Sequence, residues 1–182
     1  IAFSGDGEPT MIPNFSECVR VAIEVRAEFG LANTKLVLIT DSAGLDKVDV
    51  RAGLALMDAH QGEIWCKLDA GTAAYYRQVN RYFLRFDRIL KNILATARVR
   101  PVVIQSLFLK LHGEPMPAAE LEAYCQRLRD ILDAGGSIRE VHAYTIARPT
   151  PEAWATKLST AELAQVAQVI RDRTGLRVDV FD

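Results

Sequence analysis

Cysteine is scarce in this sequence. The 182 residues include three cysteines, Cys18, Cys66 and Cys125, which lie far apart and form no C-x-x-C pair. This spacing indicates neither a disulfide framework nor a zinc site. Cys18 and Cys125 fall on apolar stripes of expected helices, so we expect them to be reduced thiols in the core.

Long hydrophobic runs and a marked excess of one charge are also missing. No apolar run approaches the roughly 20 residues that are needed to cross a bilayer. The formal net charge is -1 and the pI is about 6.4, which gives no global attraction to nucleic acid or to an anionic membrane. We therefore expect a cytoplasmic protein without a membrane partner.

The composition does offer enough apolar material for a sizeable core. Hydrophobic residues make up 49% of the chain. A chain of this length corresponds to about one domain. We therefore expect residues 1–182 to form a single domain.

Apolar segments of strand length alternate with segments of helical period along the chain. The expected strands are 1–4, 35–40, 62–69, 101–109, 138–145 and 177–181. The expected helices are 15–29, 46–58, 72–76, 86–97, 117–133 and 160–170. The proline-containing stretches 110–117 and 146–151 are expected to be loops. Such alternation predicts right-handed βα units and a parallel sheet.

Several of these helices carry start signals or a clear apolar face. Thr72 is a candidate N-cap, and Ser159 with Glu162 forms a candidate capping box. In the first helix, three-and-four spacing predicts one buried face made of Phe15, Cys18, Val19, Ala22, Val25 and Phe29.

Polar residues gather where the expected strands end. They are Glu8, Thr40, Asp41, Ser42, Lys67, Asp69, Gln105, Tyr144 and Thr145. Alternation alone does not distinguish an open doubly wound sheet from a barrel. In α/β barrels, however, the active site lies at the carboxyl ends of the strands, so this placement favours a barrel or a partial one.

The turn Gly5-Asp6-Gly7-Glu8-Pro9-Thr10 closes the first expected strand. Glycines let the backbone approach a ligand closely, and Pro9 fixes the direction in which the chain leaves the strand. Glu8 favours a cationic group such as an α-ammonium, and glycine amides favour a carboxylate. An amino-acid head group carries both charges, although a glycine-rich turn with a solvated glutamate explains the pattern as well.

Lys67 and Asp69 are two residues apart on an expected strand, so we expect them to point to the same side. If that side is a barrel interior, the charges need a ligand or a partner, because a buried ion pair is costly. The alternative is an ordinary ion pair at the rim of the barrel.

The segment Phe3-Ser4-Gly5-Asp6-Gly7-Glu8-Pro9-Thr10 resembles the Gly-Gly-Glu motif of radical S-adenosylmethionine (radical SAM) enzymes, in the form typical of a group that includes tRNA wybutosine synthases. Further matches follow in order, at Leu38-Ile39-Thr40, Lys67-Leu68-Asp69-Ala70-Gly71-Thr72, Val103-Ile104-Gln105-Ser106 and Tyr144-Thr145-Ile146-Ala147-Arg148-Pro149. The resemblance extends almost end to end. It implies the α/β class, with a partial (β/α)6 TIM-like barrel of parallel strands whose first βα unit is missing.

The same resemblance implies where SAM would bind. Gly7 and Glu8, followed by Pro9 in the motif, would hold the methionine moiety. The ribose and adenine would meet Thr40, Ser42, Lys67, Asp69, Gln105 and the backbone of Tyr144 and Thr145. Arg148 would contact a substrate anion or only a surface acid. Where the family often has Thr-Asn, this chain has Thr40-Asp41, which loses an amide donor and adds a negative charge.

In the family, a C-x-x-x-C-x-x-C triplet upstream of the Gly-Gly-Glu strand holds a four-iron four-sulfur (4Fe-4S) cluster. These residues contain no such triplet, and Cys18, Cys66 and Cys125 cannot replace it by spacing. The chain starts on the Gly-Gly-Glu strand. We therefore expect the ligating cysteines upstream of Ile1, no metal ligands among the residues given, and no activity from this segment alone.

The implied activity is that of a radical SAM oxidoreductase or transferase. The reduced cluster passes an electron to SAM, and the resulting 5′-deoxyadenosyl radical abstracts hydrogen from a substrate. A flavodoxin or ferredoxin would be the electron donor. The substrate stays open between a small molecule, a tRNA base and a protein.

A basic run, Arg77, Arg81, Arg85, Arg88 and Lys91, could contact tRNA phosphates. A solvated helix face explains it too, and the balanced net charge favours that interpretation. The rival from another class is a non-redox barrel enzyme, aldolase-like with Lys67 as a Schiff-base nucleophile, or a module that binds SAM or phosphate.

Overall fold

The computed structural model describes residues 1–5, 7–81, 85–148 and 150–182. Asp6 of the glycine turn and Pro149 of the last matching segment lie outside the described residues. The expectations that involve these two residues stay predictions.

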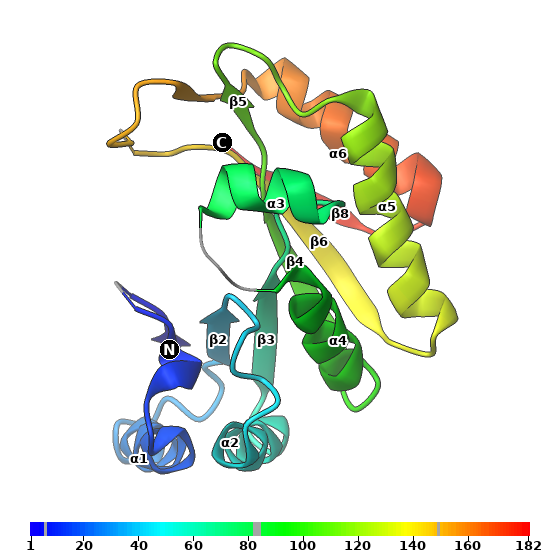
Figure 1. Cartoon of the computed structure of the whole chain (residues 1–182). Helices are drawn as coiled ribbons and strands as arrows, with labels where there is room; N and C mark the ends of the chain where they lie inside the picture. The colour runs from blue at the N-terminus through cyan, green and yellow to red at the C-terminus, as the bar shows by residue number, and fades with distance from the viewer. Residues whose placement is uncertain (6, 82–84, 149) are drawn as a thin grey trace.

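A parallel sheet of six strands forms the centre of the fold, in the order β1-β2-β3-β4-β6-β8. Its strands are β1 (Ala2–Phe3), β2 (Leu36–Thr40), β3 (Gly62–Lys67), β4 (Val102–Leu107), β6 (Ile138–Tyr144) and β8 (Val178–Phe181). Because all the strands are parallel, their carboxyl ends lie at one edge of the curved sheet (Figure 1).

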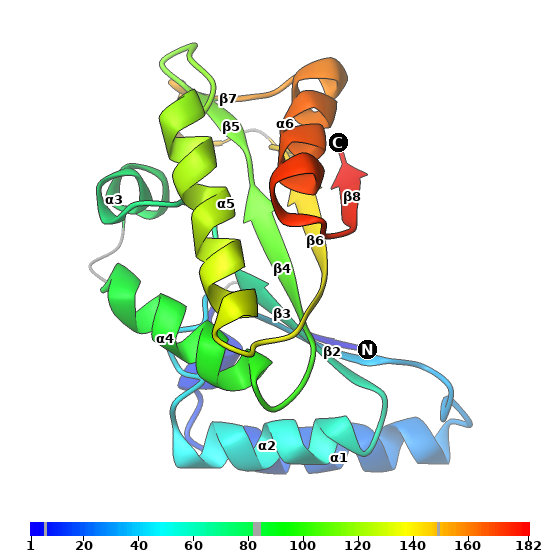
Figure 2. The same cartoon turned by 90° about the vertical axis from the view of Figure 1, so that its right-hand side faces the viewer.

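Helices alternate with these strands along the chain. They are α1 (Phe15–Glu28), α2 (Val48–Asp58), α3 (Ala73–Asn80), α4 (Phe86–Ala97), α5 (Ala118–Asp133) and α6 (Thr160–Thr174), with a 3-10 turn, η1 (Pro9–Met11), after β1. The two views show α1, α2, α4, α5 and α6 packed on one face of the sheet (Figures 1 and 2). Over the described ranges, no helix is both long enough and apolar enough to span a membrane.

The burial pattern of β2 shows why the sheet has two different faces. Leu36, Leu38 and Thr40 are buried towards the helices, whereas Val37 and Ile39 are only partly buried. Successive side chains of a strand point to opposite faces, so one face packs on helices and the other remains available. This parallel α/β architecture confirms the predicted fold class of a partial TIM-like barrel.

Helix α1 buries the expected face over its first half but not at its end. Phe15 and Val19 are buried, but Val25 and Phe29 are 43% and 70% exposed. Arg26 is buried instead, because its guanidinium donates to the backbone oxygens of Thr34 and His60 at 2.7 and 2.8 Å. The prediction for the end of this helix was wrong because an arginine can be buried when backbone carbonyls satisfy it.

A small antiparallel sheet was not predicted, and one of its strands runs into the expected loop 110–117. Strand β5 (Leu109–Leu111) pairs with β7 (Ala155–Lys157). Each strand has three residues, which is too short for a period to be recognised, and the partners lie far apart in the chain. Strand β3 also ends at Lys67, earlier than expected, so Asp69 lies beyond the strand.

Candidate functional site

A cavity of about 330 Å³ opens at the carboxyl ends of the first three strands of the sheet. It is lined by Ser4, Gly5, Gly7, Glu8, Ile39, Asp41 and Lys67. The turn after β1, the end of β2 and the end of β3 each contribute to it. We call this cavity the head-group pocket, for the ligand moiety that the sequence predicted here.

The carboxylate of Glu8 is almost fully engaged by the protein itself. Its Oε1 accepts from the Thr10 amide at 3.0 Å and from the hydroxyls of Thr10 and Thr40 at 2.6 Å each. Its Oε2 accepts from the Asp41 amide at 2.7 Å. Glu8 therefore fastens the glycine turn to the end of β2, a role that the sequence did not predict.

The loop between β2 and α2 has a fixed backbone. Asp41 Oδ1 accepts from the Ala43 amide at 2.8 Å, and Thr40 Oγ1 accepts from the Ser42 amide at 3.0 Å. Ser42 is fully buried and has a φ of 70°, in the left-handed region. A Cβ added to Gly44 would lie 2.3 Å from Thr10 Oγ1, which shows how closely the loop packs on η1.

The two loop residues predicted to contact ligand, Thr40 and Ser42, do not line the head-group pocket, whereas Asp41 between them does. Thr40 and Ser42 are buried beneath it and shape the loop. Burial and the neighbouring negative charge of Glu8 raise the pKa of Asp41 above its ordinary value, while the Ala43 amide and Lys67 oppose the rise. Asp41 thus lies in the pocket as a carboxyl group whose charge is not fully compensated.

Lys67 supplies the positive charge of the head-group pocket. It is partly buried and forms no ion pair with any acid in the described ranges. Asp69, expected beside it, is 3% exposed and does not line this pocket. Asp69 instead accepts from the Leu107 amide at 2.8 Å and from Asn80 Nδ2 at 2.9 Å, which joins β3 to β4 and α3.

A second cavity, of about 290 Å³, lies further along the sheet. It is lined by Trp65, Gln105, His142, Tyr144, Thr145, Ala147, Phe181 and Asp182, and we call it the aromatic pocket. Gln105 and Lys67 are in register on adjacent strands, so the two pockets adjoin. Neighbouring strands lie about 4.8 Å apart, and at most three strand spacings separate the centres of the two pockets. The centres therefore lie roughly 10–15 Å apart.

The predicted residues Tyr144 and Thr145 both line the aromatic pocket. Burial raises the pKa of the Tyr144 phenol, and the negative charge of Asp69 adds to the rise. The hydroxyl of Thr145 accepts from the Leu158 amide at 2.9 Å, and its amide donates to Phe181 at 3.3 Å. The polar groups of Thr145 are thus largely used within the fold.

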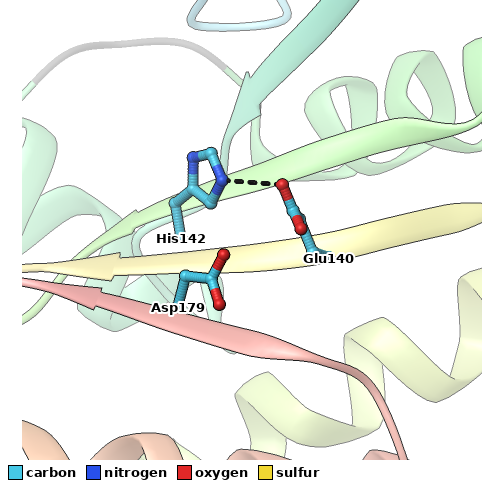
Figure 3. Close-up of side chains that lie close together, drawn as sticks. All are labelled: Glu140, His142 and Asp179. Atoms are coloured by element: carbon cyan, nitrogen blue, oxygen red, sulfur yellow. Dashed lines mark hydrogen bonds and ion pairs between the residues drawn. The ribbon is translucent and has the colours of Figure 1, made fainter.

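Next to the aromatic pocket, the sheet carries a group of ionisable side chains that the sequence did not predict. Glu140 and His142 project from β6 and Asp179 from β8 (Figure 3). His142 Nε2 lies 3.0 Å from Glu140 Oε1. Arg177 pairs with Asp179 at 2.7 Å and with Glu140 at 3.5 Å. The two acids thus already have cationic partners, and their contact depends on the pairing of β6 with β8.

The thiols of the described residues do not fit a 4Fe-4S cluster. Burial raises the pKa of Cys66 to about 12 and that of Cys125 to about 11. Cluster ligation needs several thiolates at one place, whereas these cysteines lie on β3 and α5 and Cys18 lies on α1. The described residues therefore do not fit a 4Fe-4S cluster.

The exposed basic run gives little support to a phosphate-binding surface. The run consists of Arg77, Arg81, Arg85, Arg88 and Lys91, and all five side chains are exposed. Three of them already pair with acids, Arg81 with Glu152, Arg85 with Asp87 and Arg88 with Asp46. Arg148 is exposed and lines neither pocket.

A solved structure shares this arrangement of strands and helices. The radical SAM methyltransferase from Sphaerobacter thermophilus matches the chain with a TM-score of 0.69 and 17% identity, over 100% of this chain and 50% of that one. The chain therefore shares the fold of that enzyme over this half. It spans about half the length of that enzyme. No protein-family model and no curated protein matches the sequence.

Proposed function

We propose that this chain forms the SAM-binding part of a radical SAM enzyme. The observation that carries the proposal is the pair of adjoining pockets at the carboxyl edge of a fold shared with a radical SAM methyltransferase. One pocket is lined by charged side chains and glycine backbone, and the other by aromatic and amide side chains. SAM has the same two-part character, since an amino-acid chain is joined to a nucleoside.

In this proposal the amino-acid part of SAM occupies the head-group pocket, between the glycine turn and Lys67. The adenosine part lies in the aromatic pocket, where Trp65 and Tyr144 offer aromatic surface and Gln105 offers a donor and an acceptor. The separation of roughly 10–15 Å, three strand spacings at most, suits an extended nucleoside with an amino-acid chain.

The residues of this chain would bind SAM, orient it and exclude water from it. SAM bound by enzymes of this class supplies a 5′-deoxyadenosyl radical, which is the chemistry of the cofactor. The described residues do not account for a cluster, so its ligands would come from outside them. The whole enzyme would carry out oxidoreductase or transferase chemistry on a tRNA base, a protein or a small molecule. A flavodoxin or ferredoxin would be its electron donor.

Calorimetric titration with SAM and with S-adenosylhomocysteine tests the proposal. We expect saturable binding by the protein. Gln105→Leu should weaken it by about 10-fold, the value of a hydrogen bond lost in a partly buried site. The matched control is Gln165→Leu, because Gln165 is exposed on α6. If neither ligand binds to the wild-type protein, the proposed function is wrong.

A further inference from the structure

The aromatic pocket holds a histidine whose ring is fixed in place. His142 is 6% exposed and lies between Trp65 and Phe181, with ring centroids 4.7 and 5.1 Å away and both contacts edge-to-face. Its Nε2 lies 3.0 Å from Glu140 Oε1. The aromatic contacts and this bond together restrain the ring, so its two nitrogens have defined directions.

The two ring nitrogens of His142 have different surroundings. Nε2 faces Glu140, whereas Nδ1 is on the side of the ring that points away from Glu140 and Asp179 (Figure 3). In the part of the chain that the structure describes, Nδ1 has no hydrogen-bond partner, and His142 lines the aromatic pocket. A polar atom of a buried side chain without a protein partner, in the wall of a cavity, is suited to a ligand.

Glu140 determines which nitrogen of a neutral His142 carries the proton. An ionised carboxylate only accepts hydrogen bonds, so Nε2 donates to Glu140 and Nδ1 keeps a lone pair. Glu140 and Asp179, which is in register with His142 on β8, lie close enough to stabilise the imidazolium that forms when Nδ1 takes up a proton. Arg177 pairs with both acids, but its side chain is 69% exposed, so solvent screens its charge.

A proton donor accompanies this acceptor. Tyr144 follows His142 by two positions on β6, so their side chains point to the same face, and both line the aromatic pocket. Burial raises the pKa of the Tyr144 phenol, which keeps it protonated at neutral pH. The pocket thus offers a lone pair and a phenolic proton between aromatic rings, an arrangement that suits acid–base chemistry on a flat ring.

We propose that His142 is a general base whose Nδ1 takes a proton from a flat ring compound in the aromatic pocket, and that Glu140 is the positioning residue that holds the tautomer. The proton moves from a C–H, N–H or O–H group of the ligand to Nδ1, and the bonding electron pair stays on the ligand. The inference goes beyond the proposed function, because it assigns proton transfer and not the binding of SAM. His142 lies one strand further from the head-group pocket than Gln105, where a substrate beside the nucleoside would reach it. This placement of a substrate rests on the proposed function.

The test uses 5-nitrobenzisoxazole, a flat bicyclic compound, and needs neither SAM nor a cluster. A base removes its C3 proton, the C–H electron pair completes a nitrile as the ring N–O bond breaks, and the oxygen leaves as an absorbing phenolate. We expect the wild-type protein to open the ring faster than an equal concentration of free imidazole does, because the pocket orients the probe against the base. Either proposal can therefore fail without the other.

Three variants separate a base from a histidine that only packs. His142→Asn should lower the rate by about 100-fold, and Glu140→Gln should lower it by about 10-fold or more, because the tautomer is no longer held. His112→Asn is the matched control, since His112 is exposed, stacks on Trp154 and lines neither the aromatic nor the head-group pocket. Asparagine tolerates the φ of 54° at this position, so the control should keep the wild-type rate.

Nuclear magnetic resonance adds a readout on the folded wild-type protein. At about pH 8, above the ordinary pKa of imidazole, correlation of the ring nitrogens with the ring protons should place the His142 proton on Nε2 in the wild type, and show a mixture of tautomers in Glu140→Gln. A proton on Nδ1, or a wild-type rate no higher than that of imidazole, overturns the role of His142. An unchanged rate in His142→Asn overturns it too, and an unchanged tautomer or rate in Glu140→Gln overturns the role of Glu140.

Discussion

The hydroxyl of Thr40 donates a hydrogen bond of 2.6 Å to Glu8 Oε1, across 32 positions of the chain. This bond joins the glycine turn after β1 to the carboxyl end of β2. The same hydroxyl accepts from the Ser42 amide at 3.0 Å. Thr40 therefore links the wall of the head-group pocket to the loop that carries Asp41.

Replacement of this hydroxyl should destabilise the protein. Thr40→Val keeps the shape of the side chain but leaves a buried carboxylate oxygen and an amide each short of a partner. We expect a loss of about 1–3 kcal/mol in the free energy of unfolding, measured by urea denaturation. Thr156→Val, at an exposed position of β7, is the control. Equal midpoints for both variants would show that the Thr40 bond contributes nothing.

The stability should depend on pH through Asp41. Its pKa is raised on folding, so its contribution to stability is fully present below its ordinary pKa of 3.8 and is lost as the pH rises through the higher folded value. Asp41→Asn removes that loss. After allowance for solvent screening, we expect the variant to exceed wild type at pH 7 by up to about 1 kcal/mol, and by less at pH 4.

Denaturation curves at the two pH values provide the measurement. A variant that is less stable than wild type at neutral pH would contradict the assigned repulsion between Asp41 and Glu8.

Gly71 follows β3 and lies directly against α5. A Cβ at this position would lie 2.1 Å from the Tyr124 amide nitrogen, and the Gly71 amide donates to Glu120 Oε1 at 2.7 Å. Gly71→Ala should therefore cost at least about 2–3 kcal/mol, because backbone must move to admit the methyl group. Gly7→Ala is the matched control, since a Cβ there meets nothing within 4 Å.

The measurement for the glycine pair is the thermal unfolding midpoint. We expect a clear decrease for Gly71→Ala and little change for Gly7→Ala. Similar midpoints for the two variants would mean that α5 can shift away from the end of β3 without cost.

Lys67 should act as a charge partner and not as a nucleophile. Lys67→Gln should reduce the affinity for S-adenosylhomocysteine by about 10-fold, because a charged hydrogen bond to the ligand carboxylate is lost. The control is Lys91→Gln on the exposed side of α4. Borohydride treatment with small aldehydes should give no preferential label at Lys67. Specific trapping there would favour the aldolase-like alternative.

For the glycine turn, the local sequence predicted the cavity but not the hydrogen bonds of Glu8. The residue types of Gly7 and Glu8 predicted a place where a ligand meets backbone and charge, and both residues do line a cavity with Lys67. The hydrogen-bond partners of the Glu8 carboxylate were not predictable. Its partner Thr40 comes from the next strand, and its distance depends on the pairing of β1 with β2. That the polar residues at the strand ends bind SAM stays a prediction.

By itself, the sequence determined the six strands of the parallel sheet, the helices and their alternation, because period and end signals act over a few residues. The Thr72 cap and the Ser159–Glu162 capping box are examples, and both form as predicted. Only the tertiary structure decided which polar groups remain available to a ligand. The carboxylate oxygens of Asp69 and Glu8 accept hydrogen bonds from backbone and side chains far along the chain. Hydrogen-bond satisfaction depends on contacts between segments far apart in the chain, which no local pattern records.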